Sequence, residues 1–158
     1  AIYPGSFDPV THGHLDIASR ASRLFDKVVV GVYDLPAKHL LFDTEERISL
    51  FTKAVENLKL TNVTVTPYNG LTVAFARQIG AQVIVRGLRM ASDFEHEFEM
   101  ALMNKKIAPG VELVCLMASL EFQFLSSSLL KEVCQLKGNI SSLVPPHVEV
   151  ALREKFNI

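Results

Sequence analysis

Short apolar runs alternate with helical patterns along the whole chain, and this alternation limits the fold to very few classes. Residues 27–33 form a near-continuous run of β-branched side chains, which is typical of a strand buried on both faces. Residues 43–58 then follow a helical pattern that starts with acidic residues, where the helix dipole favours negative charge. Because strands separated by helices pair in parallel, we expect an α/β fold: a Rossmann-like, doubly wound parallel sheet with helices on both faces.

The remaining elements follow from the same periodicity. Glycine and proline mark several ends, such as Gly80 after one helix and the pair Pro109-Gly110 after another. Ser92 or Asp93 is expected to cap the helix that begins there. The expected strands span residues 1–3, 27–33, 62–67, 81–85 and 111–117, and the expected helices span residues 15–25, 44–58, 72–79, 92–107, 126–136 and a last segment that starts at Pro145-Pro146.

The composition is that of a soluble globular protein, with 49% apolar and 21% charged residues among 158. We expect one domain over residues 1–158, which is long enough for a full hydrophobic core.

A formal net charge of −1 argues against nucleic acid as a partner, and no apolar run approaches the roughly 20 residues of a membrane span. Cys115 and Cys134 lie in apolar patterns and indicate reduced core thiols. No targeting segment is visible, so a cytoplasmic protein is expected.

The segment at residues 5–14 is the strongest indication of function. A Pro/Gly turn joins the first apolar strand to a helix, and the start of a helix offers free N–H groups and the positive end of the dipole. Phosphate binds readily at such a place. His14 adds an imidazole in the first turn of this helix. The segment therefore predicts a phosphate site, although a histidine there is as often a surface or core-edge residue.

Three further segments follow expected strands and should gather with residues 5–14 on one rim of the sheet. They are residues 36–38, 86–89 and 122–128, which are rich in basic and hydroxyl side chains that bind phosphate oxygens. Arg86 follows a buried strand directly, where a guanidinium is costly unless an anion or a partner meets it. The serines at 126–128 could hold a second phosphate, assisted by Lys131.

These features also have purely structural interpretations. Arg86 and Arg89 can be solvated or salt-bridged, Lys38 alone is an ordinary lysine, and the serine run can simply cap its helix. The acidic stretch at 93–99 usually means a solvated helix face, and an apolar stripe on the same helix means core or an interface. That stripe consists of Phe94, Phe98, Ala101 and Leu102.

Several reaction types are disfavoured by what the sequence lacks. His12 and His14 are two residues apart, which is poor spacing for zinc, so no metal-ligating residue is expected. No serine or cysteine stands in a nucleophile elbow, and there is no Walker A pattern.

Three motifs resemble one family closely over essentially the whole chain: the bacterial phosphopantetheine adenylyltransferases, in the nucleotidyltransferase superfamily of α/β phosphodiesterases. Residues 3–9 followed by Thr11-His12-Gly13-His14 look like the family's opening, and the last four carry its T-x-G-H element. Residues 86–89 and 92–95 look like its central motif, and residues 124–133 look like its late serine motif. The T-x-G-H element alone marks only the superfamily, whereas the three motifs in this order are highly specific.

The resemblance implies a reaction. The phosphate of 4′-phosphopantetheine would attack the α-phosphorus of ATP in line, without a covalent intermediate, to give dephospho-coenzyme A and pyrophosphate in the penultimate step of coenzyme A biosynthesis. Mg²⁺ is the expected metal, held mostly by phosphate oxygens and water. Because a phosphate monoester is already an anionic nucleophile, such a site needs alignment and charge stabilisation rather than a general base.

The resemblance also implies roles for individual residues. His14, Lys38 and Arg89 would be catalytic, with His14 at the α-phosphate and Lys38 between the phosphates of the two substrates. The implied ATP-binding residues are Ser6, Phe7, His14, Gly87, Leu88, Arg89, Glu97, Phe122, Gln123, Phe124, Leu125, Ser126, Ser127 and Ser128, and the implied phosphopantetheine-binding residues are Ser6, Lys38, Thr72 and Arg86.

Two positions depart from the family pattern. Ser6 stands where threonine is frequent and keeps the hydroxyl, and His96 stands where tyrosine is common, on the adenine side. The family is usually a hexamer, a dimer of trimers, so the resemblance implies a homohexamer, with dephospho-coenzyme A and coenzyme A as further ligands.

Two other functions stay open. One is a nucleotidyltransferase with a different phosphate acceptor, such as nicotinamide mononucleotide; residues 86–89 favour the pantetheine substrate instead. The other is a catalytically silent nucleotide-binding module. The presence of His14, Lys38, Arg86 and Arg89 argues against such a module, because a silent protein would be free to lose them.

Overall fold

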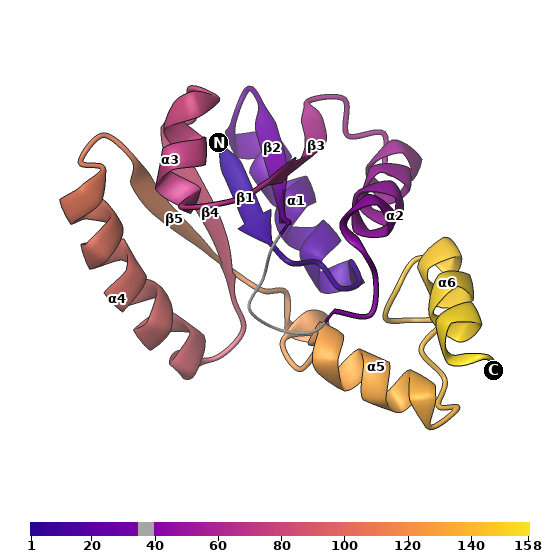
Figure 1. Cartoon of the computed structure of the whole chain (residues 1–158). Coiled ribbons are helices and arrows are strands. Elements are labelled where there is room, and N and C mark those ends of the chain that lie inside the picture. The colour runs from indigo at the N-terminus through magenta and orange to yellow at the C-terminus, as the bar shows by residue number, and fades with distance from the viewer. Residues whose placement is uncertain (35–39) are drawn as a thin grey trace.

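A computed structural model describes residues 1–34 and 40–158, and its strands form one parallel sheet (Figure 1). In this part of the chain the sheet has five strands in the order β3-β2-β1-β4-β5, and every pairing is parallel. The predicted Rossmann-like α/β fold is confirmed. The strands are β1 (Ile2–Gly5), β2 (Val28–Tyr33), β3 (Val63–Tyr68), β4 (Val83–Leu88) and β5 (Glu112–Met117).

The direction in which strands are added reverses beside β1. β2 and β3 extend the sheet to one side of β1, and the chain then returns to place β4 and β5 on the other side. In the register of β1 against β4, Ile2 pairs with Ile84 near the amino ends of both strands. Beyond that pair the carboxyl ends of the two strands separate, and such a switch point is where open α/β sheets bind ligands.

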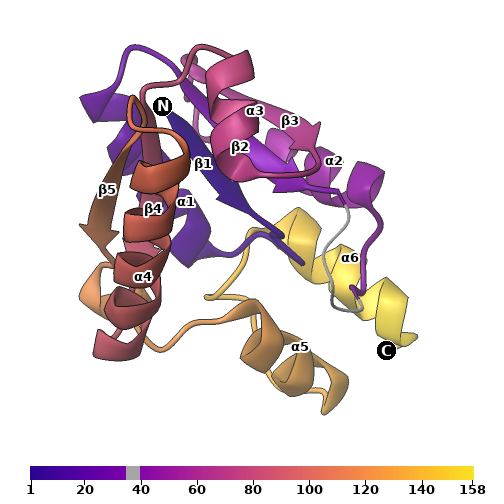
Figure 2. The same ribbon diagram turned by 60° about the vertical axis from the view of Figure 1, so that its left-hand side comes forward.

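Helices cover both faces of the sheet (Figures 1 and 2). Val28, Val30 and Val32 of β2 point into the core shared with the first two helices and the two C-terminal ones, whereas Ile2 and Ile84 pack on the opposite face with the third helix. The helices are α1 (His12–Leu24), α2 (Thr44–Asn57), α3 (Thr72–Gln78), α4 (Ala91–Ile107), α5 (Ser127–Gln135) and α6 (Pro146–Phe156), with a 3₁₀ turn η1 (Leu120–Phe122).

Side chains cap α2 and α5 at their first residues. The carboxylate of Asp43 accepts the N–H of Glu46 at 2.9 Å, and the Glu46 carboxylate accepts the N–H of Asp43 at 2.9 Å. This capping box begins α2 where the sequence predicts it. Ser126 caps α5 by accepting the N–H of Leu129 at 3.2 Å, so the structural interpretation of that serine is confirmed.

Two predictions about the central motif are wrong. β4 continues to Leu88, beyond the predicted end, because its pairing with β5 overrides the low strand preference of arginine and glycine. Arg86 and Gly87 therefore lie within the strand rather than after it. α4 starts at Ala91 without a side-chain cap, because Asp93 accepts the N–H of Arg89 instead of capping the helix.

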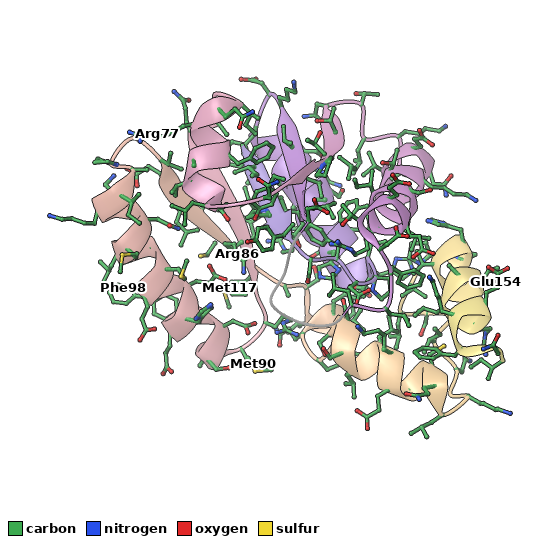
Figure 3. The ribbon with its side chains drawn as sticks, viewed as in Figure 1. Arg77, Arg86, Met90, Phe98, Met117 and Glu154 are labelled. Carbon is green, nitrogen blue, oxygen red and sulfur yellow. The ribbon has the colours of Figure 1, made fainter. Side chains whose placement is uncertain are left out.

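The flank formed by α4 and β5 exposes apolar side chains for which the sequence left a core and an interface position open. Phe94 and Phe98 are 55% and 54% exposed, so they are not core residues, and Figure 3 shows Phe98 at the edge of the molecule. β5 is an edge strand, and α4 buries only Glu97 against the rest of the chain. Cys115 on β5 is exposed, so the prediction of core thiols holds only for Cys134.

None of the helices within residues 1–34 and 40–158 combines the length and the apolar character that crossing a membrane requires.

Candidate active site

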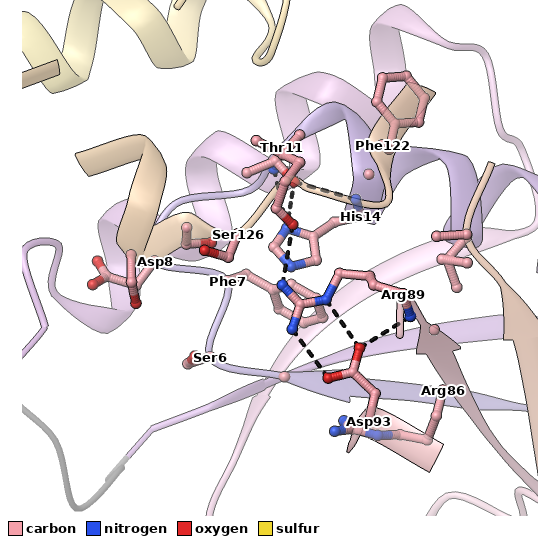
Figure 4. A pocket seen from close by; sticks show the side chains of 18 of the residues that line it. Ser6, Phe7, Asp8, Thr11, His14, Arg86, Arg89, Asp93, Phe122 and Ser126 are labelled. Atoms are coloured by element: carbon pink, nitrogen blue, oxygen red, sulfur yellow. Dashed lines mark hydrogen bonds and ion pairs between the residues drawn. The ribbon is translucent and has the colours of Figure 1, made fainter. Parts of the chain in front are cut away.

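A cavity of about 520 Å³ opens at the switch point of the sheet (Figure 4). It brings together the turn after β1, the start of α1, the end of β4 with the start of α4, and the approach to α5, which lie far apart in the sequence. Three of the four segments predicted to share a rim therefore meet. The predicted site residues on the cavity wall are Ser6, Phe7, His14, Arg86, Gly87, Arg89, Glu97, Phe122, Leu125, Ser126, Ser127 and Ser128.

The first turn of α1 orients the His14 ring. Nδ1 of His14 accepts the backbone N–H of Thr11 at 3.1 Å and lies 3.1 Å from the Thr11 hydroxyl. The Thr11 hydroxyl in turn accepts the N–H of His14 at 3.4 Å, which completes a capping box. Because Nδ1 is an acceptor, the neutral ring carries its proton on Nε2. His14 is thus held on the cavity wall as a donor through Nε2.

The turn after β1 depends on close packing around Phe7. Phe7 has a φ of 48°, in the left-handed region that side chains rarely adopt, and its ring packs edge-on against His14 with centroids 5.1 Å apart. A Cβ on Gly5 would lie 2.7 Å from the Phe7 ring, so only glycine fits there. The packing places Ser6 and its backbone on the cavity wall.

Arg86 is held by Glu97 of α4. Nη2 and Nε of Arg86 approach Oε1 of Glu97 at 2.6 and 2.7 Å, and Nη1 donates to the carbonyl of Pro4 at 2.8 Å. Burial alone lowers the pKa of the guanidinium, but the hydrogen bond and charge of Glu97 raise it above its ordinary value. Arg86 is therefore always charged, and its predicted salt-bridged alternative is confirmed.

Arg89 is held in a similar way by Asp93, which the sequence prediction of site residues omitted. Nε and Nη2 of Arg89 donate to the two Asp93 oxygens at 3.1 and 3.2 Å, while Nη1 donates to the Leu125 carbonyl at 3.2 Å. Burial raises the pKa of Asp93, but hydrogen bonds from the side chain and backbone of Arg89 outweigh it and lower the pKa. The i,i+4 spacing of the two residues is the signal that could have identified this pair.

A third ion pair, Asp8 with Lys131, joins the β1 turn to α5. Asp8 is 2% exposed, and its oxygens accept the N–H groups of Leu41 and Phe42 at 3.0 Å. Lys131 contacts the same carboxylate, and the hydroxyl of Ser127 donates to the Pro9 carbonyl at 2.9 Å. The role of Asp8 was not predicted; a carboxylate inside the apolar opening motif was the available signal. Each of the three carboxylates on the cavity wall is thus paired with a cation of the protein.

A second cavity of about 410 Å³ adjoins the first one. Its wall includes Thr72, whose hydroxyl lies 2.9 Å from that of Tyr68. The two cavities share wall residues at the carboxyl end of β1 and at the Arg86 ion pair. These shared residues are Pro4, Gly5, Ser6, Arg86, His96 and Glu97.

Four predicted site residues are not placed on either wall. Lys38 lies outside the residues that the structure describes. Leu88 is buried at 5% exposure, Phe124 is 59% exposed, and the amide of Gln123 donates to the Ala118 carbonyl at 3.5 Å. Leu88, Gln123 and Phe124 flank wall residues in the chain, which is why a motif-based prediction includes them.

Comparison with known sequences gives a consistent result. Residues 2–133 match the model of the cytidylyltransferase-like family. The chain is 54% identical to a phosphopantetheine adenylyltransferase of Desulfitobacterium hafniense strain Y51, over 99% of this chain and 95% of the relative. It is 52% identical to a phosphopantetheine adenylyltransferase of Thermomicrobium roseum, over 99% of this chain and 94% of the relative.

Solved structures share the fold at lower sequence identity. A nicotinate-nucleotide adenylyltransferase from Vibrio parahaemolyticus matches with a TM-score of 0.69 and 19% identity, over 96% of both chains. A nicotinic acid mononucleotide adenylyltransferase of Plasmodium falciparum, complexed with NaAD, matches with a TM-score of 0.63 and 18% identity, over 99% of this chain and 95% of the other.

Proposed function

The chain belongs to the cytidylyltransferase-like family and within it to the phosphopantetheine adenylyltransferases, and from this premise we propose that it transfers the adenylyl group of ATP to 4′-phosphopantetheine. The products are dephospho-coenzyme A and pyrophosphate. One observation carries the proposal: two adjoining cavities meet at Ser6 and Arg86, as a reaction between two phosphate-bearing substrates requires.

The larger cavity is the proposed ATP site, and the smaller one receives 4′-phosphopantetheine. Arg86 stands on both walls, so it can bind the acceptor's phosphate beside the α-phosphate of ATP. Thr72 lines the acceptor's cavity. The proposal also includes the ATP-binding roles of the remaining predicted residues, among them Leu88, Gln123 and Phe124. It includes the bridging role of Lys38 as well.

The proposed step is an in-line displacement at the α-phosphorus. A phosphate oxygen of the acceptor forms the new P–O bond, and the bond from the α-phosphorus to the α,β-bridging oxygen breaks, with its electron pair leaving on pyrophosphate. No proton has to be removed from the nucleophile. His14 donates from Nε2 to the oxygen on which charge develops, and its ring is already oriented by Thr11. Arg89 adds positive charge to the same cavity.

In the proposed reaction Mg²⁺ would be held by the phosphates of the substrate rather than by side chains of the protein. Within residues 1–34 and 40–158, no group of three histidine, cysteine or carboxylate side chains is arranged to hold a metal ion. Asp8, Asp93 and Glu97 of the cavity wall are each committed to a lysine or an arginine. Phosphate oxygens and water would therefore hold the ion, which is a usual arrangement for Mg²⁺. When bound, it would neutralise charge on the departing pyrophosphate.

The predicted assembly and ligands belong to the same proposal. In a homohexamer, a neighbouring subunit would bury the exposed apolar side chains of α4, which include Phe94, Phe98 and Leu102. We also retain the single domain over residues 1–158, the cytoplasmic location, and dephospho-coenzyme A and coenzyme A as further ligands. Light scattering of the purified protein measures the assembly.

Turnover by the purified protein tests the proposal. Pyrophosphate release is measured with ATP, Mg²⁺ and 4′-phosphopantetheine, and in parallel with nicotinamide mononucleotide as the acceptor. Release with phosphopantetheine alone is expected. Release only with the other acceptor would keep the chemistry and reassign the substrate, and no release with either would favour a silent binding module.

A further inference from the structure

Arg47 of α2 is a buried charge that the reaction proposed above does not use. Its side chain is 1% exposed, and burying a guanidinium is costly unless its donors are satisfied. Nη1 donates to the carbonyl of Ser6 at 2.8 Å and to the carbonyl of Tyr33 at 2.9 Å. One nitrogen thus ties the turn after β1 to the carboxyl end of β2.

The other nitrogens of Arg47 hold the start of its own helix. Nε donates to the carbonyls of Phe42 and Asp43, both at 3.2 Å, and Nη2 donates to the hydroxyl of Thr44 at 2.7 Å. These acceptors are uncharged oxygens. Burial lowers the pKa of the guanidinium, and the nearby carboxylates of Asp8, Asp34 and Asp43 oppose that shift without cancelling it. The guanidinium therefore joins three chain segments at one point.

The contact with Ser6 has a consequence for the cavity. The carbonyl of Ser6 and the N–H of Phe7 belong to one planar trans peptide unit, so they point in opposite directions. By holding the carbonyl, Arg47 sets the direction of the Phe7 N–H. Phe7 needs such support because its φ of 48° is rarely adopted by residues with a side chain.

We propose that Arg47 is a positioning residue that aims the Ser6–Phe7 peptide N–H at the substrate phosphates. This inference rests on the proposed function, which assigns Ser6 and Phe7 to phosphate binding. Arg47 touches no substrate itself: it does not line either cavity. It acts through the backbone on the alignment of the reacting groups.

The test compares Arg47→Lys and Arg47→Met with a matched control, Asn62→Ala. Asn62 also holds two backbone carbonyls of a distant segment, those of Ser22 and Phe25 at 2.8 and 3.0 Å, but it lines neither cavity. Stability is measured by denaturant unfolding, and kcat and both KM values are measured per folded molecule. Lysine keeps the charge but cannot make the forked contacts of arginine.

Arg47→Lys is expected to lower kcat by about 10- to 100-fold, with much smaller changes in KM, because misplacing a catalytic group by about 1 Å has such an effect. Arg47→Met is expected to be worse, and Asn62→Ala to lose stability while keeping the wild-type kcat. A kcat for Arg47→Lys equal to that of Asn62→Ala would overturn the proposal.

If neither Arg47 variant folds, Thr44→Val tests the positioning role of Arg47. It removes the acceptor of Nη2, so the guanidinium keeps its charge but is less firmly oriented toward the Ser6 carbonyl. A lowered kcat supports the proposal, and an unchanged kcat overturns it. A wild-type protein without turnover would instead refute the proposed function, so the two failures are distinguishable.

Discussion

The wall of the cavity built from β1 and α1 and the wall built from β4 and α4 hold their polar side chains by different means. On the first wall, His14 accepts a backbone N–H, and the carboxylate of Asp8 accepts two more, although it also pairs with Lys131. On the second wall, Arg86 and Arg89 are held mainly by carboxylates of α4. The first wall rests on the core of the protein, whereas the second rests on a helix with an exposed outer face.

The difference indicates separate tasks for the two walls. A ring fixed by backbone contacts keeps one geometry, which suits a donor that must meet charge developing at the α-phosphorus. An arginine paired with a carboxylate is oriented, and its charge is balanced until a phosphate arrives. We therefore expect variants of the first wall to lower kcat and variants of the second wall to raise KM.

The largest effect is expected from His14→Ala on the first wall. Loss of one preorganised donor lowers kcat by roughly 10²- to 10³-fold, because the transition state gains charge that the ground state lacks. The affinity for ATP should change modestly. Steady-state kinetics with both substrates measures kcat and the two KM values separately, with Asn62→Ala as the control for folding. An unchanged kcat would remove His14 from the mechanism.

On the second wall, Arg86→Ala should mainly raise the KM for 4′-phosphopantetheine. A hydrogen bond to a charged group contributes about 1.5–3 kcal/mol, which corresponds to roughly a 10- to 100-fold loss of affinity. Arg77→Ala, an exposed arginine on α3, is the matched control and should leave both KM values unchanged. A loss of ATP affinity without a loss of phosphopantetheine affinity would contradict the role of Arg86.

A double variant separates the phosphate-binding role of Arg86 from its role in neutralising Glu97. Removing Arg86 leaves Glu97 buried at 7% exposure without its cation, which destabilises the fold by itself. Arg86→Ala combined with Glu97→Gln relieves that penalty. The raised KM should persist in the double variant; recovery of the wild-type KM would show that the single variant acted by disturbing Glu97.

The two walls also differ in how much of them the sequence predicts. Local patterns indicate that His14 lies in the first turn of α1, although α1 begins at His12 rather than at the expected Leu15, and they indicate the caps of α2 and α5. They can do so because a helix start depends on a few neighbouring residues. The partners of Asp8 could not be predicted, because they lie 33 to 123 positions away. The contact of Arg47 with Ser6 could not be predicted either, because it spans 41 positions and depends on the direction of one peptide. The Arg86–Glu97 contact joins a strand to the next helix and has no spacing rule.

Asp93→Asn tests the second wall through the pH dependence of stability. The pKa of Asp93 is lowered in the folded state, so its ionised form stabilises the fold above the unfolded pKa of about 3.9. That stabilisation is lost as the pH falls through the lowered pKa. Wild type should therefore exceed the variant in free energy of unfolding at pH 7, and the difference should shrink on acidification below pH ~4. A difference that grows on acidification would contradict the assignment.

The smallest effect is expected from Ser126→Ala, where α5 closes the cavity between the two walls. Loss of the N-cap should lower the free energy of unfolding by about 1 kcal/mol. If the hydroxyl also binds a phosphate of ATP, the KM for ATP rises by roughly tenfold, since a hydrogen bond to a charged group contributes at least about 1.5 kcal/mol. Unfolding and kinetics are compared with Ser142→Ala, an exposed serine away from either cavity. A loss of stability with an unchanged KM would leave Ser126 as a helix cap and confine ATP recognition to the two walls.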